Sequence, residues 1–241
     1  MLALRDEIVS RAFDPPGAWW PDQPDTIGGR DRHAGGSWCV SDVATGVTAV
    51  VLNRPERQSA AVGAPSRGVL PIVAIREREN WPASVDTAPM AGFNLVLASP
   101  QSLLWWSFDG QELRRHSLSE GTHLFTPDGL QSAPTDQRLA TGGAAISKLG
   151  AAAIQRASTE QLWDGWLAAV RDCVPTADRS GLVVRRPIGD DSYETVFGQF
   201  IAAWPGLLRL DYLDRVARDA GRQWTTKQWT TKQRVSTISA T

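Results

Sequence analysis

The feature that most constrains the fold is a series of short apolar segments in the middle of the chain, separated by turn signals. Residues 93–98 and 103–108 are rich in strand-forming side chains, and Asp109-Gly110 is a hairpin dipeptide that leads into residues 113–118. Strands joined by such short connections pair in opposite directions. The pattern therefore predicts an antiparallel meander in the middle of the fold.

The segments before this meander predict a further hairpin and a helix. Residues 38–40 and 47–52 flank a short polar connection over residues 42–46 that suits a hairpin. Residues 68–79 place a proline near the start of a short helix that ends in charged residues. In contrast, residues 13–36 hold prolines and paired glycines throughout, and this composition predicts an extended loop.

The beginning of the chain predicts a strand that is cut short. Leu2-Ala3-Leu4 is an apolar stub that runs directly into Arg5-Asp6-Glu7, whereas a strand normally needs about 4–8 residues. We therefore expect the first strand to be missing and the domain to be truncated at its N-terminus. Residues 236–241 are β-prone and end without a turn, which suggests a truncation at the C-terminus as well.

The second half predicts helices followed by strands. Residues 144–157 are rich in alanine, and residues 159–172 place their apolar side chains on one face after a capping serine. Further strands are predicted over residues 182–185, 193–203 and 207–212. This order of strands, helices and strands predicts an α+β fold, which we interpret as a single domain over residues 1–241.

Composition and charge exclude several classes of protein. The 241 residues carry 25 Lys and Arg against 26 Asp and Glu, so the near-zero net charge gives no electrostatic reason to expect a nucleic-acid partner. The longest uncharged stretch, residues 87–108, contains prolines and amides that do not suit a transmembrane segment. No signal sequence is visible, so we expect a cytoplasmic protein. The expected partner is a small molecule of unknown identity, and the sequence does not indicate the oligomeric state.

Most chemical motifs are absent, and one charged cluster remains. His33, His116 and His123 lack the spacing of metal ligands, so no metal site is predicted, and Cys39 is interpreted as a buried, unreactive thiol. Arg5-Asp6-Glu7 is either a solvated strand end or a site in which carboxylates hold an arginine for a nucleophile or a carboxylate substrate. The residues alone leave both readings open.

This cluster and four later segments resemble one known family. Leu4-Arg5-Asp6-Glu7 resembles the Asn-Arg-Asp-Glu motif of the NRDE family, also called the transport and Golgi organisation protein 2 family. The segments that carry the rest of the resemblance are Gly28-Gly29-Arg30-Asp31 with Ala34-Gly35-Gly36-Ser37-Trp38, Val47 to Asn53, Ser66-Arg67-Gly68, and Gly92-Phe93-Asn94-Leu95. The resemblance covers residues 2–98 in the family's order.

The resemblance implies an Ntn-hydrolase-like αββα sandwich, in which helices flank two antiparallel sheets. In this family the second residue is typically Cys, which Ntn hydrolases use as nucleophile with their own α-amine as base. Here position 2 is Leu, and Leu4 replaces the Asn of the motif. The candidate catalytic residues carried over are therefore Arg5, Asp6 and the oxyanion donor Asn53, with no nucleophile. The motif residues carried over are Glu7, Arg30, Asp31, Gly35, Gly36, Trp38 and Asn94.

Three functional readings follow from the resemblance. The first is an amide hydrolase that is inactive as written. The second is a binding or trafficking protein related to haem or to secretory membranes; haem is a cofactor suggested by the family alone, and no other cofactor is predicted. The third is a gene model with a start codon placed too late. In that case the full-length protein would have the missing strand and the Cys, and would be an Ntn-type amidohydrolase.

Overall fold

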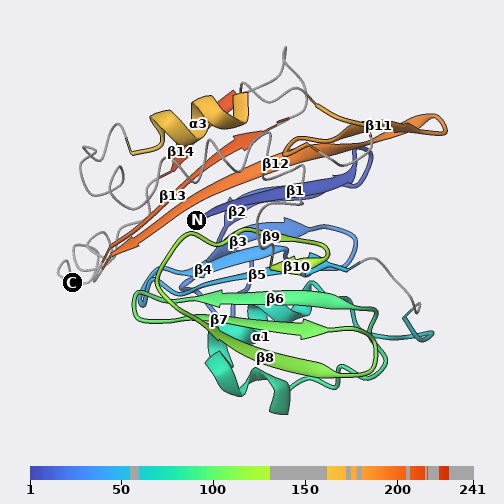
Figure 1. The fold of residues 1–241 in the computed structure, drawn as a ribbon, viewed down its shortest axis with the longest axis vertical. Helices are drawn as coiled ribbons and strands as arrows, with labels where there is room; N and C mark the ends of the chain where they lie inside the picture. The colour runs from blue at the N-terminus through green and yellow to red at the C-terminus, as the bar shows by residue number, and fades with distance from the viewer. Residues whose placement is uncertain are drawn as a thin grey trace.

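The computed structural model describes residues 1–54, 60–130, 162–171, 175–177, 181–204, 207–214, 216 and 223–227. Within these residues the fold is built on two large antiparallel sheets, seen stacked on each other in Figure 1. A small hairpin, β9 (Phe125–Thr126) and β10 (Gly129–Leu130), forms a third, two-stranded sheet. No helix in the described ranges is long and apolar enough to cross a membrane.

The seven-stranded sheet follows the order of the chain. Its strands are β2 (Phe13–Gly17), β3 (Thr26–Asp31), β4 (Cys39–Asp42), β5 (Thr48–Asn53), β6 (Phe93–Ala98), β7 (Leu103–Phe108) and β8 (Leu113–Leu118). Each pairs antiparallel with the next, although β5 and β6 are joined by a longer segment that contains helices.

The five-stranded sheet joins the two ends of the chain. It runs in the order β1 (Leu2–Ile8), β12 (Asp191–Trp204), β13 (Leu207–Asp214) and β14 (Gln223–Lys227). The short strand β11 (Arg185–Ile188) pairs with the first residues of β12. The first strand of the chain therefore depends on the last third of the sequence for its hydrogen bonds.

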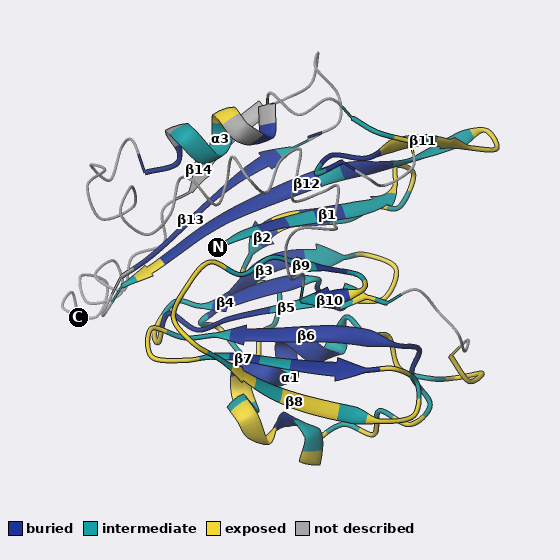
Figure 2. Ribbon diagram, in the orientation of Figure 1, coloured by how far each residue is buried: buried dark blue, intermediate teal, exposed yellow. Residues whose placement is uncertain are grey.

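Three apolar clusters hold four layers together. One lies between the seven-stranded sheet and α1 (Val69–Glu77), which continues as the 3₁₀ helix η1 (Arg78–Ala83). A second joins α3 (Asp164–Arg171) to the outer face of the five-stranded sheet, and a third fills the space between the sheets. The layers thus run helix, sheet, sheet, helix, and Figure 2 shows β6 and β13 mostly buried but β8 largely exposed.

The structure confirms the coarse prediction of an α+β sandwich and most of its local elements. The meander has the predicted bounds in β6, β7 and β8, and the predicted hairpin and helix appear as β4–β5 and α1. The amphipathic helix is found as α3, and β12 and β13 lie where the later strands were predicted. The predicted helix over residues 144–157 lies outside the described residues.

The predicted loop over residues 13–36 is wrong, because this stretch contains β2 and β3. The two prolines of β2, Pro15 and Pro16, are tolerated because β2 is the edge strand of its sheet. Gly28 and Gly29, expected in turns, lie inside β3, where the backbone of β4 and the ring of Trp38 approach too closely for a side chain.

The prediction of a strand stub at the N-terminus is also corrected. β1 continues through Arg5, Asp6 and Glu7 to Ile8 and pairs with β12 over its whole length. Charged residues remain in the strand because their side chains find partners on both faces of the sheet. The strand predicted over residues 182–185 begins only at Arg185, as β11, while Val183 and Val184 are buried just before it.

Candidate functional site

Arg5 is the one candidate catalytic residue whose side chain enters the space between the sheets. Its side chain is only 6% exposed. The guanidinium carbon lies 4.5 Å from the centre of the Trp38 ring and 5.0 Å from that of Phe13. Such stacking on aromatic faces stabilises a cation and fixes the plane of the guanidinium.

Two carboxylates hold Arg5 loosely. Its Nη2 lies 3.4 Å from Glu7 Oε2 and 3.5 Å from Asp31 Oδ2, which is long for a charge-assisted hydrogen bond. Its Nη1 is buried and has no hydrogen-bond partner. Burial lowers the pKa of Arg5 from its ordinary value, and the nearby carboxylates of Glu7 and Asp31 oppose this change. The guanidinium therefore retains spare donor capacity.

The strand geometry of β1 and the glycines of β3 create this arrangement. Side chains alternate across β1, so Arg5 shares the inner face with Ala3, a member of the core between the sheets. Trp38 needs the space above Gly29, since a Cβ there would lie 2.2 Å from the ring. Glycine at this position therefore allows the Trp38 ring to lie against the guanidinium of Arg5.

Asp31 anchors the cluster from the end of β3. Its Oδ2 accepts a hydrogen bond from Arg11 Nε at 2.6 Å, and its Oδ1 accepts the backbone N–H groups of His33 and Ala34. Burial alone would raise the pKa of Asp31, but the hydrogen bonds from Arg11 and from Ala34 outweigh burial and hold the pKa below 3.8. The carboxylate is thus ionised at neutral pH.

The loop after Asp31 contains two of the motif glycines. Gly35 has a φ of +70°, a conformation that few other residues adopt, while a Cβ on Gly36 would lie 2.5 Å from the backbone of Gly68. Glycine at position 35 thus allows the turn, and glycine at position 36 allows the backbone of Gly68 to approach closely. Both residues therefore shape the loop that follows Asp31.

The pKa of Asp31 predicts a pH dependence of stability. Because this pKa is lower in the folded state, the stabilisation is complete above the unfolded pKa of about 4 and is lost as pH falls through the folded value. We expect Asp31→Asn to lower stability at pH 7 and to flatten the loss below pH ~4. Urea unfolding between pH 2 and 7 measures this. The exposed Asp22 provides the control, and an equal flattening in Asp22→Asn would contradict the prediction.

The other two candidate catalytic residues do not join Arg5. Asp6 follows Arg5 in the strand and points to the opposite face, where its Oδ1 accepts the hydroxyl of Thr195 at 2.6 Å. Asn53 is exposed at the end of β5, and no hydrogen bond within the described residues joins it to Arg5 or Asp6. A catalytic role for either of them stays a prediction.

Two motif residues, Arg30 and Asn94, have structural partners of their own. Arg30 donates to Asp14 Oδ2 through Nε and Nη2, and stacks on the ring of Trp19. Asn94 is fully buried beneath the β9–β10 hairpin, where it donates to the carbonyl of Pro127 and accepts from Trp105 Nε1. Arg30 therefore ties β2 to β3, and Asn94 holds the small hairpin against the sheet.

The described residues offer neither an evident nucleophile nor a metal centre beside Arg5. Cys39 is fully buried in the core between the sheets, and this burial raises the pKa of its thiol to about 12. The Met1 α-amine donates a hydrogen bond to the carbonyl of Ile201. No group of three or more metal-ligating side chains occurs in the described part of the chain.

Sequence reasoning missed a buried ion pair beneath α3. Arg209 donates from Nε to Asp211 Oδ2 at 2.6 Å, and the Trp163 indole N–H of the helix segment donates to the same oxygen. Both charged side chains are almost completely buried. Their spacing of two residues in a strand was the available signal, because it places both on one face.

The fold and this site define a class: an α+β protein of two stacked antiparallel sheets, with an arginine held by carboxylates in the space between them. The family model for transport and Golgi organisation 2 matches residues 1–193, which include Arg5, Asp31 and Trp38. The chain therefore belongs to the transport and Golgi organisation 2 family, also named NRDE, as the sequence resemblance indicated. No curated protein matches the chain.

Proposed function

We propose that this chain is a single-domain, Ntn-hydrolase-like protein that binds the carboxylate group of a small molecule through Arg5 and does not hydrolyse it. The observation that carries the proposal is the buried Nη1 of Arg5, a charged donor without a hydrogen-bond partner. Buried donors are normally paired, so an unpaired one calls for an explanation such as a ligand. A carboxylate is the acceptor that a guanidinium fits best.

The surroundings of Arg5 support this ligand class. The cluster contains two arginines, Arg5 and Arg11, and two carboxylates, Glu7 and Asp31, so a bound carboxylate meets no large excess of negative charge. Glu7 and Arg11 are 24% and 35% exposed, so a ligand would approach from their side. The aromatic rings beside the guanidinium suit an apolar acyl or amino-acid body next to the carboxylate.

We expect no hydrolysis, because the groups described around Arg5 include no activated nucleophile. Leu2 and Met1 carry no nucleophilic oxygen or thiol, and the Cys39 thiol is protonated at neutral pH. An Arg without an activated nucleophile can orient a carboxylate but cannot start acyl transfer.

Titration calorimetry with N-acyl amino acids tests this function. We expect saturable binding that Arg5→Gln weakens roughly tenfold or more, because a charge-assisted hydrogen bond is lost. Arg30→Gln is the matched control, since Arg30 lies in β3 next to Asp31 but is paired with Asp14. Equal binding by wild type and Arg5→Gln would refute the site.

The same compounds test for hydrolysis. We expect no turnover of N-acyl amino acids by the chain. Turnover that survives both Arg5→Ala and alkylation of the thiols would exclude the proposed site and restore an enzymatic reading.

The family's association with haem finds little support in the described residues. His123 Nε2 lies 2.8 Å from the Ser119 carbonyl, His116 stacks on Trp105, and Met90 is buried in the core beneath α1. These three side chains are already engaged and so make poor ligands of a haem iron, whereas His33 is exposed in its loop. Haem binding stays a prediction of the family resemblance, and titration with haem that gives no saturable Soret shift would remove it.

A further inference from the structure

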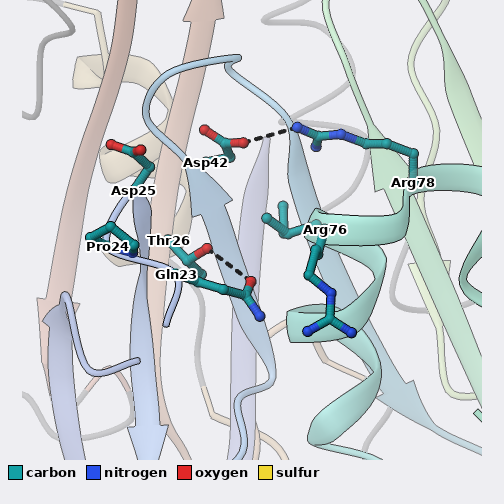
Figure 3. Close-up of a pocket in the computed structure, with 8 residues that line it drawn as sticks. Gln23, Pro24, Asp25, Thr26, Asp42, Arg76 and Arg78 are labelled. Carbon is teal, nitrogen blue, oxygen red and sulfur yellow. Dashed lines mark hydrogen bonds and ion pairs between the residues drawn. The ribbon is translucent and has the colours of Figure 1, made fainter. Parts of the chain in front are cut away.

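Polar side chains gather at the opposite end of β3 from Asp31. A hollow of about 200 Å³ opens where the end of α1 meets the start of β3 and the end of β4. Figure 3 shows its polar lining. Arg76 and Arg78 both come from the helical segment on one side of the hollow, and Arg78 reaches across to Asp42. The residues that carry the argument are Gln23, Asp25, Thr26, Asp42, Arg76 and Arg78.

Arg78, which lines this hollow, has an unfavourable backbone conformation. It follows the last residue of α1 with φ 57° and ψ −133°, and among the described residues it is the only non-glycine with a positive φ. Glycine adopts a positive φ without a Cβ penalty, whereas a residue with a side chain is strained there. Strained residues of this kind cluster at binding and catalytic sites, where the surroundings hold them in place.

The acceptors in the hollow are already used. Asp42 Oδ2 accepts from Arg78 Nη2 at 2.9 Å, and Asp42 Oδ1 accepts two backbone N–H groups of the following turn. Gln23 Oε1 accepts the hydroxyl of Thr26 at 3.3 Å. Asp25 has an interaction partner of its own.

The donors in the hollow are only partly used. Arg78 Nη1 is buried and has no hydrogen-bond partner. The ion pair recorded for Arg76 uses its Nε, which binds Glu77 Oε1. A buried donor is normally paired, so the unpaired Arg78 Nη1 calls for an explanation, and a ligand in the hollow toward which the guanidinium turns would supply the acceptor.

We propose that this hollow binds a small oxyanion, a carboxylate or a phosphate group. Guanidinium groups pair with either anion through parallel N–H donors. The hollow is smaller than the 300–1,000 Å³ that is typical for larger ligands, which points to a small metabolite. The lining contains two arginines, Arg76 and Arg78, and two carboxylates, Asp25 and Asp42, so an approaching anion meets no excess of negative charge.

Isothermal titration calorimetry on the full chain tests this site with separate probes. Inorganic phosphate represents the phosphate arm, succinate the carboxylate arm, and succinamide the uncharged control. We expect saturable binding of phosphate or succinate, and the arm that binds identifies the anion. Binding should weaken roughly tenfold or more in Arg78→Gly and clearly in Arg76→Gln, because each removes a charged donor.

Arg78→Gly also separates binding from folding. Glycine adopts a positive φ without a Cβ penalty, so this variant removes the guanidinium without adding backbone strain. Arg114→Gln is the matched control, since Arg114 pairs with Asp109 and Glu112 on the exposed strand β8. The proposal is overturned if neither anion binds, if succinamide binds equally well, or if Arg78→Gly binds as wild type does.

Discussion

Replacement of Asp211 by alanine is expected to destabilise the protein by about 3–5 kcal/mol, the usual effect of removing one partner of a buried ion pair. The change leaves the Arg209 guanidinium, 8% exposed, without its carboxylate beneath α3. It also removes the acceptor of the Trp163 indole N–H. Denaturant unfolding measures the loss as a lower midpoint at unchanged slope.

A double-mutant cycle distinguishes the cost of an unpaired charge from the value of the pair. We expect Arg209→Met and Asp211→Leu together to lose much less than the sum of the two single changes, because no charge remains buried alone. Arg114→Ala, which alters an exposed ion pair on β8, should change stability little. Additive losses in the cycle would contradict the expected coupling.

The second large effect is expected at Gly28 in β3. A Cβ at this position would lie 2.5 Å from the carbonyl oxygen of Cys39 and 2.7 Å from Val40 Cγ1. The carbonyl belongs to the backbone of the paired strand β4, so it cannot move without disturbing the sheet. We expect Gly28→Ala to cost about 3 kcal/mol, at the upper end of overpacking effects, as measured by thermal or denaturant unfolding.

Gly35→Ala is the matched comparison, because the reason for glycine differs there. Gly35 has a φ of +70° but no atom within 4 Å of an added Cβ. Its replacement should therefore cost only the left-handed backbone penalty of about 1–2 kcal/mol. A larger loss in Gly35→Ala than in Gly28→Ala would show that crowding does not determine the requirement for glycine in β3.

The sequence was informative for some strands and misleading for others. The meander β6–β8 was predicted at its correct bounds because its strands and turns are encoded by neighbouring residues. β2 and β3 were missed because proline and glycine usually interrupt strands. Here the position of β2 at a sheet edge and the closeness of β4 to β3 make those residues suitable. Neither circumstance is visible in the local sequence.

The same limit applies to the candidate sites. Arg5 was found from its charged cluster, but its partners come from elsewhere in the chain: Asp31 ends β3, and Trp38 directly precedes β4. Asp6 was grouped with Arg5 because the two are adjacent, whereas strand alternation separates them onto opposite faces. The hollow at Arg78 could not be predicted at all, because a positive φ at an arginine leaves no mark in the sequence.

The pairing of β1 with β12 has a consequence for the order in which the protein folds. The Met1 amine and the Ile201 carbonyl are hydrogen-bonded across 200 residues, whereas neighbours in the seven-stranded sheet are consecutive strands of the chain. Local pairings form faster, because closing a long loop costs entropy before any contact rewards it. During synthesis the seven-stranded sheet can therefore assemble first, while β1 leaves the ribosome before the other described strands and waits longest for its partner. Until β12 arrives, β1 has no described strand to pair with, and the cluster around Arg5 is incomplete.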